Sequence, residues 1–409
     1  MTAFVLTIFA LVYAGMALGR LPGLMLDRTG IALLGAIALL LGGAVDGAGV
    51  AQAIDFPTLF ILLGLMLLSA QFALAGFYDW CALRIARAGR GPEALLALTV
   101  AVSGGLSAVL ANDVVVFAMT PMLIAGLKGR GLDPRPYLIA LAGAANAGSA
   151  ATIIGNPQNI LIGQAGGLDF WRFLGACGAP ALLAMAIVFL TVRHVWRGRL
   201  ALPEGPSPMP ETPPPDRWQL AKGLAGTLAL LALFATPLPH ETGVLAVAGA
   251  MLVSRRLSSR RHLGLVDWNL LVLIAALFTV THALAATGLP GRVVETLAGA
   301  GLGLDGLGFL APFSLLASNS IGNVPAVVLL IQVWQAPPEG ALYALALLST
   351  LSGNLLVTGS LANIITVERA AACGVTLGFR EHARCGVPMT LASLAAAALW
   401  LWTTGLAGF

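Results

Sequence analysis

The amino-acid sequence predicts an all-α protein that spans a membrane many times, and three observations support this fold class. The 409 residues are 58% hydrophobic and only 10% charged, whereas soluble domains carry about 25% charged residues. The mean hydropathy is +0.91. Apolar runs near the roughly 20 residues that a spanning helix needs recur along the whole chain.

We expect about ten transmembrane helices, one for each apolar run of suitable length. The first run is expected to be retained, because it lacks the basic start and the small-residue cleavage site of a signal peptide. The runs lie at about 1–19, 29–45, 56–76, 137–165, 172–193, 218–236, 240–254, 266–288, 341–367 and 386–407.

Two further apolar regions, 92–127 and 306–334, are each interrupted near the middle by polar residues. Each half is too short to cross a membrane comfortably alone. We therefore expect two re-entrant hairpins that enter and leave on the same side. The interrupting residues are Asn112 and Asp113 in the first region and Ser318, Asn319 and Ser320 in the second.

Positive charges orient these elements, because cytoplasmic loops are enriched in Lys and Arg. With both termini outside, all 22 Lys and Arg residues except Arg172 and Arg292 fall on the cytoplasmic side. Hairpin 92–127 then opens to the cytoplasm and hairpin 306–334 to the exterior. We expect a multi-pass protein of the bacterial inner (cytoplasmic) membrane. Because the basic residues flank the membrane, the net charge of +4 indicates no nucleic-acid partner.

The chain is expected to consist of two repeats joined by a cytoplasmic linker. Residues 196–217 are rich in proline and polar residues, which is typical of a linker. They separate a first repeat, 1–195, from a second repeat, 218–409. The four cysteines form no C-x-x-C pair, so neither a disulfide framework nor a thiolate metal site is expected.

Short motifs support the repeat. The pattern G-x-x-x-N-I occurs once per half, starting at Gly155 and Gly359, and C-G-x-P follows each time, starting at Cys177 and Cys385. The predicted topology gives the two halves opposite orientations. Inverted repeats are typical of secondary transporters, in which the binding site lies near the membrane midplane where the repeats meet.

This architecture brings polar residues and glycines of both halves to the midplane, where two broken helices are expected. Backbone carbonyls freed there, with Asn and Ser oxygens, suit a small cation such as Na⁺. Helix N-termini suit an oxyanion or a hydroxylated neutral solute. Alternatively, such residues only bond neighbouring helices. The candidate ligands are Asn112, Asp113, Ser149, Thr152, Gly155, Asn156, Asn159, Ser318, Asn319, Ser320, Asn323, Ser352, Asn354, Thr358, Gly359 and Asn363.

Asp113 is the one acidic residue that this topology leaves deep in the bilayer, with no Lys or Arg placed deep enough to pair with it. Asp267, Glu295 and Glu368 are expected at membrane edges, exposed to water. A deep carboxylate is costly and marks ion or proton pathways. Asp113 is therefore the candidate coupling carboxylate, although a purely structural role is the alternative.

The stretches "LANDVVVFAMTP", "IGNPQNILI", "SNSIGNVPAVV" and "SGNLLVTGSLANI" resemble hairpin and broken-helix motifs of the ion transporter superfamily. The similarity is closest to the arsenite-efflux permease and sodium–proton antiporter branch, including bacterial "anion transporter" relatives. The divalent-anion–sodium symporters are more distant, since Asp113 stands where that branch has a threonine. The resemblance implies a homodimer whose scaffold domains support moving transport domains.

The expected function is ion-coupled secondary active transport, and proton-coupled antiport of a small inorganic solute is the leading hypothesis. The solute would be an oxyanion or an arsenite-like metalloid hydroxide. Sodium-coupled uptake of an anion such as a dicarboxylate, sulfate or phosphate, or sodium–proton antiport, is the alternative. No enzymatic motif and no P-loop occurs, so neither catalysis nor a cofactor is expected beyond Na⁺ or H⁺ as coupling ion. A passive channel is the third class.

Overall fold

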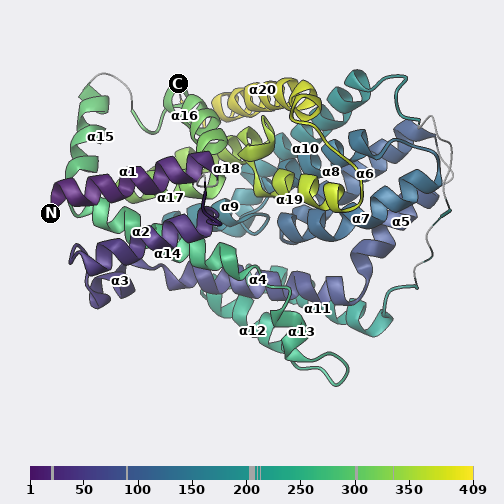
Figure 1. Cartoon of the computed structure of the whole chain (residues 1–409), viewed down its shortest axis with the longest axis horizontal. Coiled ribbons are helices and arrows are strands. Elements are labelled where there is room, and N and C mark those ends of the chain that lie inside the picture. Colours follow the sequence, from purple (N-terminus) through teal and green to yellow (C-terminus); the bar gives the residue numbers. More distant parts are fainter. Residues whose placement is uncertain are drawn as a thin grey trace.

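The computed structural model is a bundle of helices (Figure 1). It describes all residues except 20–22, 89–90, 202–207, 210, 212, 300–302, 335 and 409, and also omits the side chains of 297 and 298. Within these described residues, the only β-type pairing is one isolated bridge between Leu132 and Ala201. Part of the expected linker, 196–217, lies outside the described residues.

Two successive series of helices make up the described chain. The first series comprises α1 (Thr2–Leu18), α2 (Arg28–Leu41), α3 (Gly47–Ala53), α4 (Phe56–Leu74), α5 (Phe77–Arg87), α6 (Pro92–Ser107), α7 (Asn112–Gly129), α8 (Pro134–Ser149), α9 (Pro157–Gly166) and α10 (Phe170–Val195). The second comprises α11 (Arg217–Leu233), α12 (His240–Leu252), α13 (Ser259–Leu263), α14 (Trp268–Ala285), α15 (Leu289–Gly299), α16 (Leu307–Ser320), α17 (Asn323–Val333), α18 (Glu339–Ser352), the 3₁₀ turn η1 (Val357–Gly359), α19 (Leu361–Ala372) and α20 (Phe379–Thr403). The helices of the two series have similar lengths except for α7, of 18 residues, and α17, of 11 residues.

Four helices of the described residues are long and apolar enough to cross a membrane, namely α4, α10, α14 and α20. Shorter apolar helices of 10–17 residues include α1, α2, α6, α17 and α18. Fewer helices than the ten expected reach this length. The runs 137–165 and 341–367 are each divided between two helices, and α1, α2, α11 and α12 have 17 residues or fewer. The protein is nevertheless an all-helical, multi-pass membrane protein.

Helices α4 and α14, which hold the same place in the two series, begin and end with the same local chemistry. The Asp55 carboxylate accepts a hydrogen bond from the Thr58 N–H before α4, and the Asp267 carboxylate accepts one from the Leu270 N–H before α14. Such capping satisfies an N–H that has no partner in the first turn. After each helix a glycine with positive φ, Gly76 or Gly288, turns the chain into the next short helix.

The interruptions that the sequence predicts are present. The chain leaves helical conformation at 108–111 between α6 and α7, and at 321–322 between α16 and α17. It is also broken between α8 and α9, and between α18 and α19. Close packing constrains the end of α8, at the break between α8 and α9. A Cβ on Gly148 would lie 2.1 Å from the Gly104 carbonyl oxygen of α6.

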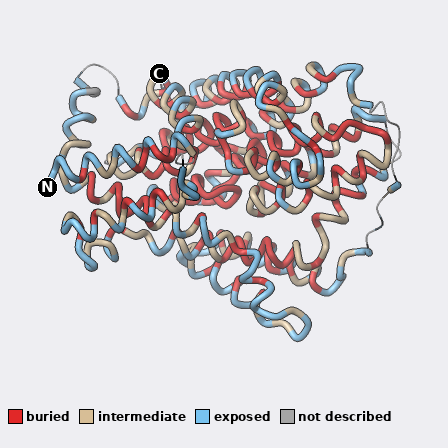
Figure 2. Tube along the Cα trace, in the orientation of Figure 1, coloured by how far each residue is buried: buried red, intermediate tan, exposed pale blue. Residues whose placement is uncertain are grey.

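The buried core lies at the centre of the molecule, in α8, α9 and α18 (Figure 2). Every residue from Ala341 to Ser352 is buried, and so is almost the whole of α8. Helices α6, α7, α10, α19 and α20 pack around these three. Both broken helices are therefore inside the protein, where irregular backbone can be satisfied by other protein groups.

Candidate functional site

A cavity of about 880 Å³ lies between the start of α2, the first turns of α7, α9 and α14, the tip between α16 and α17, and one side of α19. Polar and charged side chains from both halves of the chain line it. The charged ones are Asp27, Arg28, Asp113, Asp267, Glu368 and Arg369. This composition identifies the cavity as the candidate site.

A buried chain of asparagines joins the two halves behind the cavity. The Asn112 amide donates to Asn146 Oδ1 at 3.2 Å, and the Asn146 amide donates to Asn354 Oδ1 at 2.8 Å. Asn354 in turn donates to the Gly143 carbonyl at 3.0 Å, and the Ser360 hydroxyl donates to Asn146 Oδ1 at 2.9 Å. Buried polar networks of this kind hold the groups they connect in one arrangement.

The two helix breaks are stabilised in the same way. Asn159 donates to the carbonyls of Ser149 and Thr152, at 3.2 and 2.9 Å. Asn363 donates to the carbonyls of Gly353 and Leu356, at 2.8 and 3.1 Å. The acceptors stand ten and seven residues before the asparagine in both cases. The shared G-x-x-x-N-I pattern thus encodes a side chain that satisfies carbonyls freed by the break.

The first break brings together the predicted residues of its half. Asn156 caps α9 by accepting from the Asn159 N–H at 2.9 Å, and its amide donates to the Ser149 hydroxyl at 2.9 Å. The Thr152 hydroxyl donates to the Ala108 carbonyl at 2.6 Å. The first hairpin is also held here, since the Asn112 N–H donates to the Gly155 carbonyl at 3.3 Å.

The second break gathers most, but not all, of its predicted residues. Asn319 donates to the Ser352 carbonyl at 2.9 Å, and its Oδ1 crowds the position that a Cβ on Gly359 would take. The Ser318 hydroxyl donates to the Ser349 carbonyl at 3.4 Å. Thr358 is exposed in the cavity wall.

Ser320 does not join this cluster. It is exposed, and its hydroxyl donates back to the Leu316 carbonyl of its own helix at 2.7 Å. Its place in the last turn of α16 turns the side chain away. At the two hairpin tips, Asn112 begins α7 and Asn323 begins α17, so these two asparagines hold corresponding places.

Within the part of the chain that the structure describes, several buried oxygens near the two breaks have no hydrogen-bond donor. An unsatisfied buried acceptor costs about 1–3 kcal/mol, so such atoms mark places where a ligand with a positive charge or an O–H would be stabilised. Oxygen ligands of this type suit hard cations. They are Oδ1 of Asn112, Asn323 and Asn363 and Oγ of Ser352.

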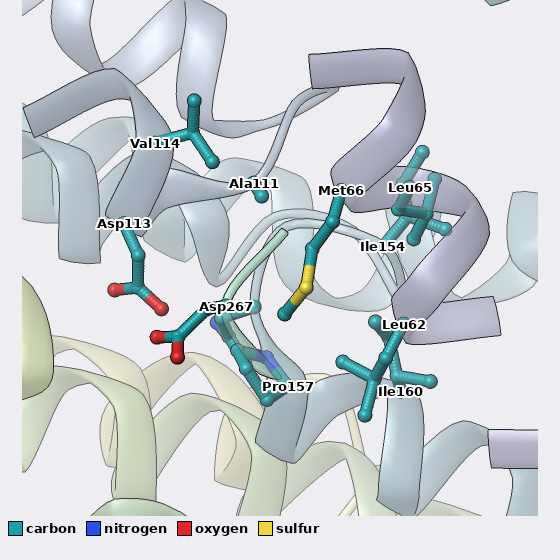
Figure 3. Close-up of a pocket in the computed structure, with 11 residues that line it drawn as sticks. Leu62, Leu65, Met66, Ala111, Asp113, Val114, Ile154, Pro157, Ile160 and Asp267 are labelled. Atoms are coloured by element: carbon teal, nitrogen blue, oxygen red, sulfur yellow. The ribbon is translucent and has the colours of Figure 1, made fainter. Parts of the chain in front are cut away.

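That Asp113 is the one carboxylate deep in the bilayer stays a prediction, and the structure adds that Asp267 lies near it. Both are half-buried and line the same cavity. Figure 3 shows their carboxyl groups directed toward each other. A hollow of about 30 Å³ adjoins them, enough for one water-sized species. Two facing carboxylates repel unless a proton or a cation lies between them.

No ion pair of Asp113 with Lys or Arg is found among the described residues, but two arginines share its cavity. Arg28 and Arg369 line the cavity with Asp113. The Arg369 guanidinium carbon lies 4.0 Å from the centre of the Phe117 ring in α7, a cation–π contact. Sequence distance hid these neighbours, since the chain segments meet only in the folded protein.

Sequence reasoning also missed four buried polar residues of the site, which are Asn146, Gln158, Thr350 and Ser360. Asn146 connects both halves, and the Thr350 hydroxyl meets Asn156, Gln158 and Asn159 at 3.2–3.3 Å. Asn146 and Thr350 lie in otherwise apolar helices. A lone amide within an alanine-rich run was the available signal.

A family model described as "Citrate transporter" matches residues 4–352. The chain belongs to the citrate transporter family. Inner membrane protein YbiR of Escherichia coli (strain K12) is 31% identical to it, over 78% of this chain and 81% of that protein. The 46 kDa membrane protein of Mycobacterium leprae is 28% identical over 98% of each chain. The silicon efflux transporter LSI3 of Oryza sativa subsp. japonica is 27% identical, over 90% and 91%.

A solved structure supports the fold of this citrate transporter family member. The crystal structure of the Alcanivorax borkumensis YdaH transporter superposes with a TM-score of 0.59 at 16% identity, covering 99% of this chain and 98% of that one. The match to the citrate transporter family, not this structural likeness, supports the expected ion transporter superfamily and the class of secondary transporter. The arsenite-permease branch within the superfamily stays a prediction.

Proposed function

We propose that this protein is a proton-coupled antiporter of a small oxygen-rich solute and that Asp113 is its coupling carboxylate. The observation that carries this proposal is the pair of facing carboxyl groups, Asp113 and Asp267, in the wall of a large cavity. The pair favours an intervening proton or cation. A solute that binds nearby changes the field at the pair, and this links solute binding to proton release.

The motion that would use this pair follows from the two matched helix series. We propose that the series are inverted repeats, with re-entrant hairpins α6–α7 and α16–α17. The hairpins and broken helices would move as a transport domain against a scaffold that includes α2 and α14. In this scheme both termini lie outside, and the cavity faces the cytoplasm of a bacterial inner membrane. A homodimer would hold the scaffolds in place.

The proposed solute is a small inorganic oxyanion or a metalloid hydroxide such as arsenite. The family description names citrate, and one relative is named for silicon efflux. Both names fit solutes rich in oxygen. The amide-lined cavity wall, with Asn112 and Asn323 among its residues, supplies donors and acceptors for such solutes.

A second candidate function is sodium coupling, as uptake of an anion or as sodium–proton antiport. Sodium coupling is favoured by the buried oxygens of Asn112, Asn323, Asn363 and Ser352 that accept no hydrogen bond. These oxygens and the backbone carbonyls at the helix breaks are ligands of the kind that suits Na⁺. Besides H⁺ or Na⁺, we propose no cofactor.

The test is transport in liposomes that contain a pH-sensitive dye. A proton gradient is imposed, and arsenite, phosphate, sulfate, citrate or Na⁺ is added in turn to wild type, Asp113→Asn and Asp305→Asn. Asp305 is exposed outside the cavity, so that variant is the matched control. One solute should collapse the gradient with wild type and Asp305→Asn but not with Asp113→Asn. Equal proton flux in all three proteins would contradict the proposal.

A further inference from the structure

Arg28 stands in the cavity wall, and among the described residues only its Nε has a hydrogen-bond partner. Its Nε donates to the Met16 carbonyl at 3.2 Å. The four ion pairs found among the described residues do not include it. Its neighbour Asp27 is engaged elsewhere, since one carboxylate oxygen accepts from the Gly30 N–H at 2.8 Å. The two terminal nitrogens of Arg28 are therefore available to a ligand.

The guanidinium faces the tip of the second hairpin. Nη1 of Arg28 lies 3.5 Å from the position that a Cβ on Gly322 would occupy. Gly322 has φ +100°, a conformation that residues with a side chain rarely adopt. Directly after it α17 begins at Asn323.

The start of α17 adds a second source of positive potential. The first N–H groups of a helix have no acceptor in a preceding turn, and the helix dipole is positive at this end. Asn323 is 8% exposed, lines the cavity, and its Oδ1 has no donor. That oxygen can accept a hydrogen bond from an O–H group of a ligand or bind a cation. Arg28 and the start of α17 therefore form a positive pole with one adjacent acceptor.

The same cavity carries a negative pole at the first hairpin. Asp113 follows Asn112 there, whereas the apolar Val324 follows Asn323 in the second hairpin. Arg369 over the Phe117 ring and Asp27 next to Arg28 partly offset these two poles. The two facing carboxylates Asp113 and Asp267 still repel an anion from the first tip, and Arg28 attracts it to the second. A charged solute is thereby oriented within the cavity.

We propose that Arg28, together with the first turn of α17, binds a negatively charged oxygen of the transported solute, a carboxylate or oxyanion that also carries an O–H group. This inference rests on the proposed function and narrows its solute to anions, in preference to uncharged hydroxides. Arg28 belongs to α2, which lies outside the hairpins and broken helices. It can therefore bind the anion only while the second tip stands beside α2, as it does in this structure.

The test measures binding by the purified protein in detergent, without any gradient. Citrate, phosphate and sulfate serve as anionic probes, and arsenious acid serves as an uncharged one, with isothermal titration calorimetry at neutral pH. The proteins are wild type, Arg28→Gln, Arg28→Lys and Arg255→Gln. Arg255 is exposed and outside the cavity, which makes it the matched control. Size-exclusion profiles and melting curves establish that each variant is folded.

At least one anionic probe should bind to wild type and to Arg255→Gln with the same Kd. Arg28→Gln should raise that Kd at least about tenfold, since a charge-assisted contact is lost, and Arg28→Lys should fall between. The proposal is overturned if Arg28→Gln binds the anion as well as wild type does. It is also overturned if wild type binds only the uncharged probe or no anionic probe. This binding assay needs no proton gradient. Its result can therefore be interpreted even if the liposome assay shows no antiport.

Discussion

The two broken-helix regions differ much less than the two hairpin tips that pack against them. At the breaks, Asn159 and Asn363 donate to carbonyls at identical sequence offsets. At the tips, Asp113 in one hairpin corresponds to Val324 in the other, and Gly322 with φ +100° corresponds to Ala111 with φ −57°. The shared features keep unwound backbone stable inside the protein. The features that differ carry the charge and the close approach to Arg28, so we expect the transport chemistry to lie there.

The largest expected effect concerns the space at the first break. A Cβ on Gly155 would lie 2.2 Å from the Ser149 carbonyl oxygen and 2.6 Å from its Cα, both backbone atoms that cannot move aside. Gly155→Ala should destabilise the folded protein by about 3 kcal/mol or more. Thermal unfolding in detergent measures this. The Gly105→Ala variant is the control, since a Cβ there meets nothing within 4 Å. An unchanged melting temperature for Gly155→Ala would break the account of that region.

The next effect compares the two asparagines directly. Removing either side chain leaves one buried carbonyl, of Ser149 or of Gly353, without its donor, at about 1–3 kcal/mol. The carbonyls of Thr152 and Leu356 keep the N–H groups of Gly155 and Gly359. Asn159→Ala should cost more than Asn363→Ala. The reason is that Asn159 Oδ1 also accepts from the Thr350 hydroxyl at 3.3 Å, whereas Asn363 Oδ1 has no partner. Melting curves of both variants, with Ser320→Ala as an exposed control, give the ranking. The reverse order would show that the breaks are not stabilised as described.

A smaller effect is expected at the hairpin tips. Gly322→Ala forces a side chain into a strained backbone region, at about 1–3 kcal/mol. Ala111→Gly, at the corresponding position, should cost only about 0.5–1 kcal/mol, since Ala111 is already in an allowed conformation. Unfolding free energies of the two variants decide the point. Equal losses of unfolding free energy in the two variants would contradict the described difference between the second tip, beside Arg28, and the first tip.

The smallest effect concerns the short helix α13, which stands in the second series where α3 stands in the first. Burial, and then the Lys222 ammonium, lower the pKa of His262 in α13. One ring nitrogen of His262 lies 3.0 Å from Gln71 Oε1 of α4. Because the unfolded chain binds the proton more readily, at a pKa of about 6.5, stability should fall as the pH drops through 6.5 toward the lower folded-state pKa. Melting temperatures between pH 7 and pH 5 test this. The decline should be shallower in His262→Gln, and identical profiles would contradict it.

Local patterns allowed the helical class, the two interruptions and the helix breaks to be predicted. Gly155 and Asn159 stand in a motif whose spacing directly reflects the break. The neighbours of Asp113 could not be predicted in this way. Asp267 and Arg28 lie near the ends of apolar runs, where charged residues are ordinarily solvated. These two residues line the cavity only because α2 and α14 lie beside the hairpins in the folded protein.

The central claim is that Asp113 couples proton movement to solute movement, and solute counterflow tests it most directly. Liposomes are loaded with unlabelled solute, the one identified by gradient collapse, and uptake of the labelled solute is measured with and without a proton gradient. We expect Asp113→Asn to exchange solute at a rate near that of wild type but to lose gradient-driven accumulation. If Asp113→Asn still accumulates solute against its gradient as wild type does, Asp113 is not the coupling carboxylate.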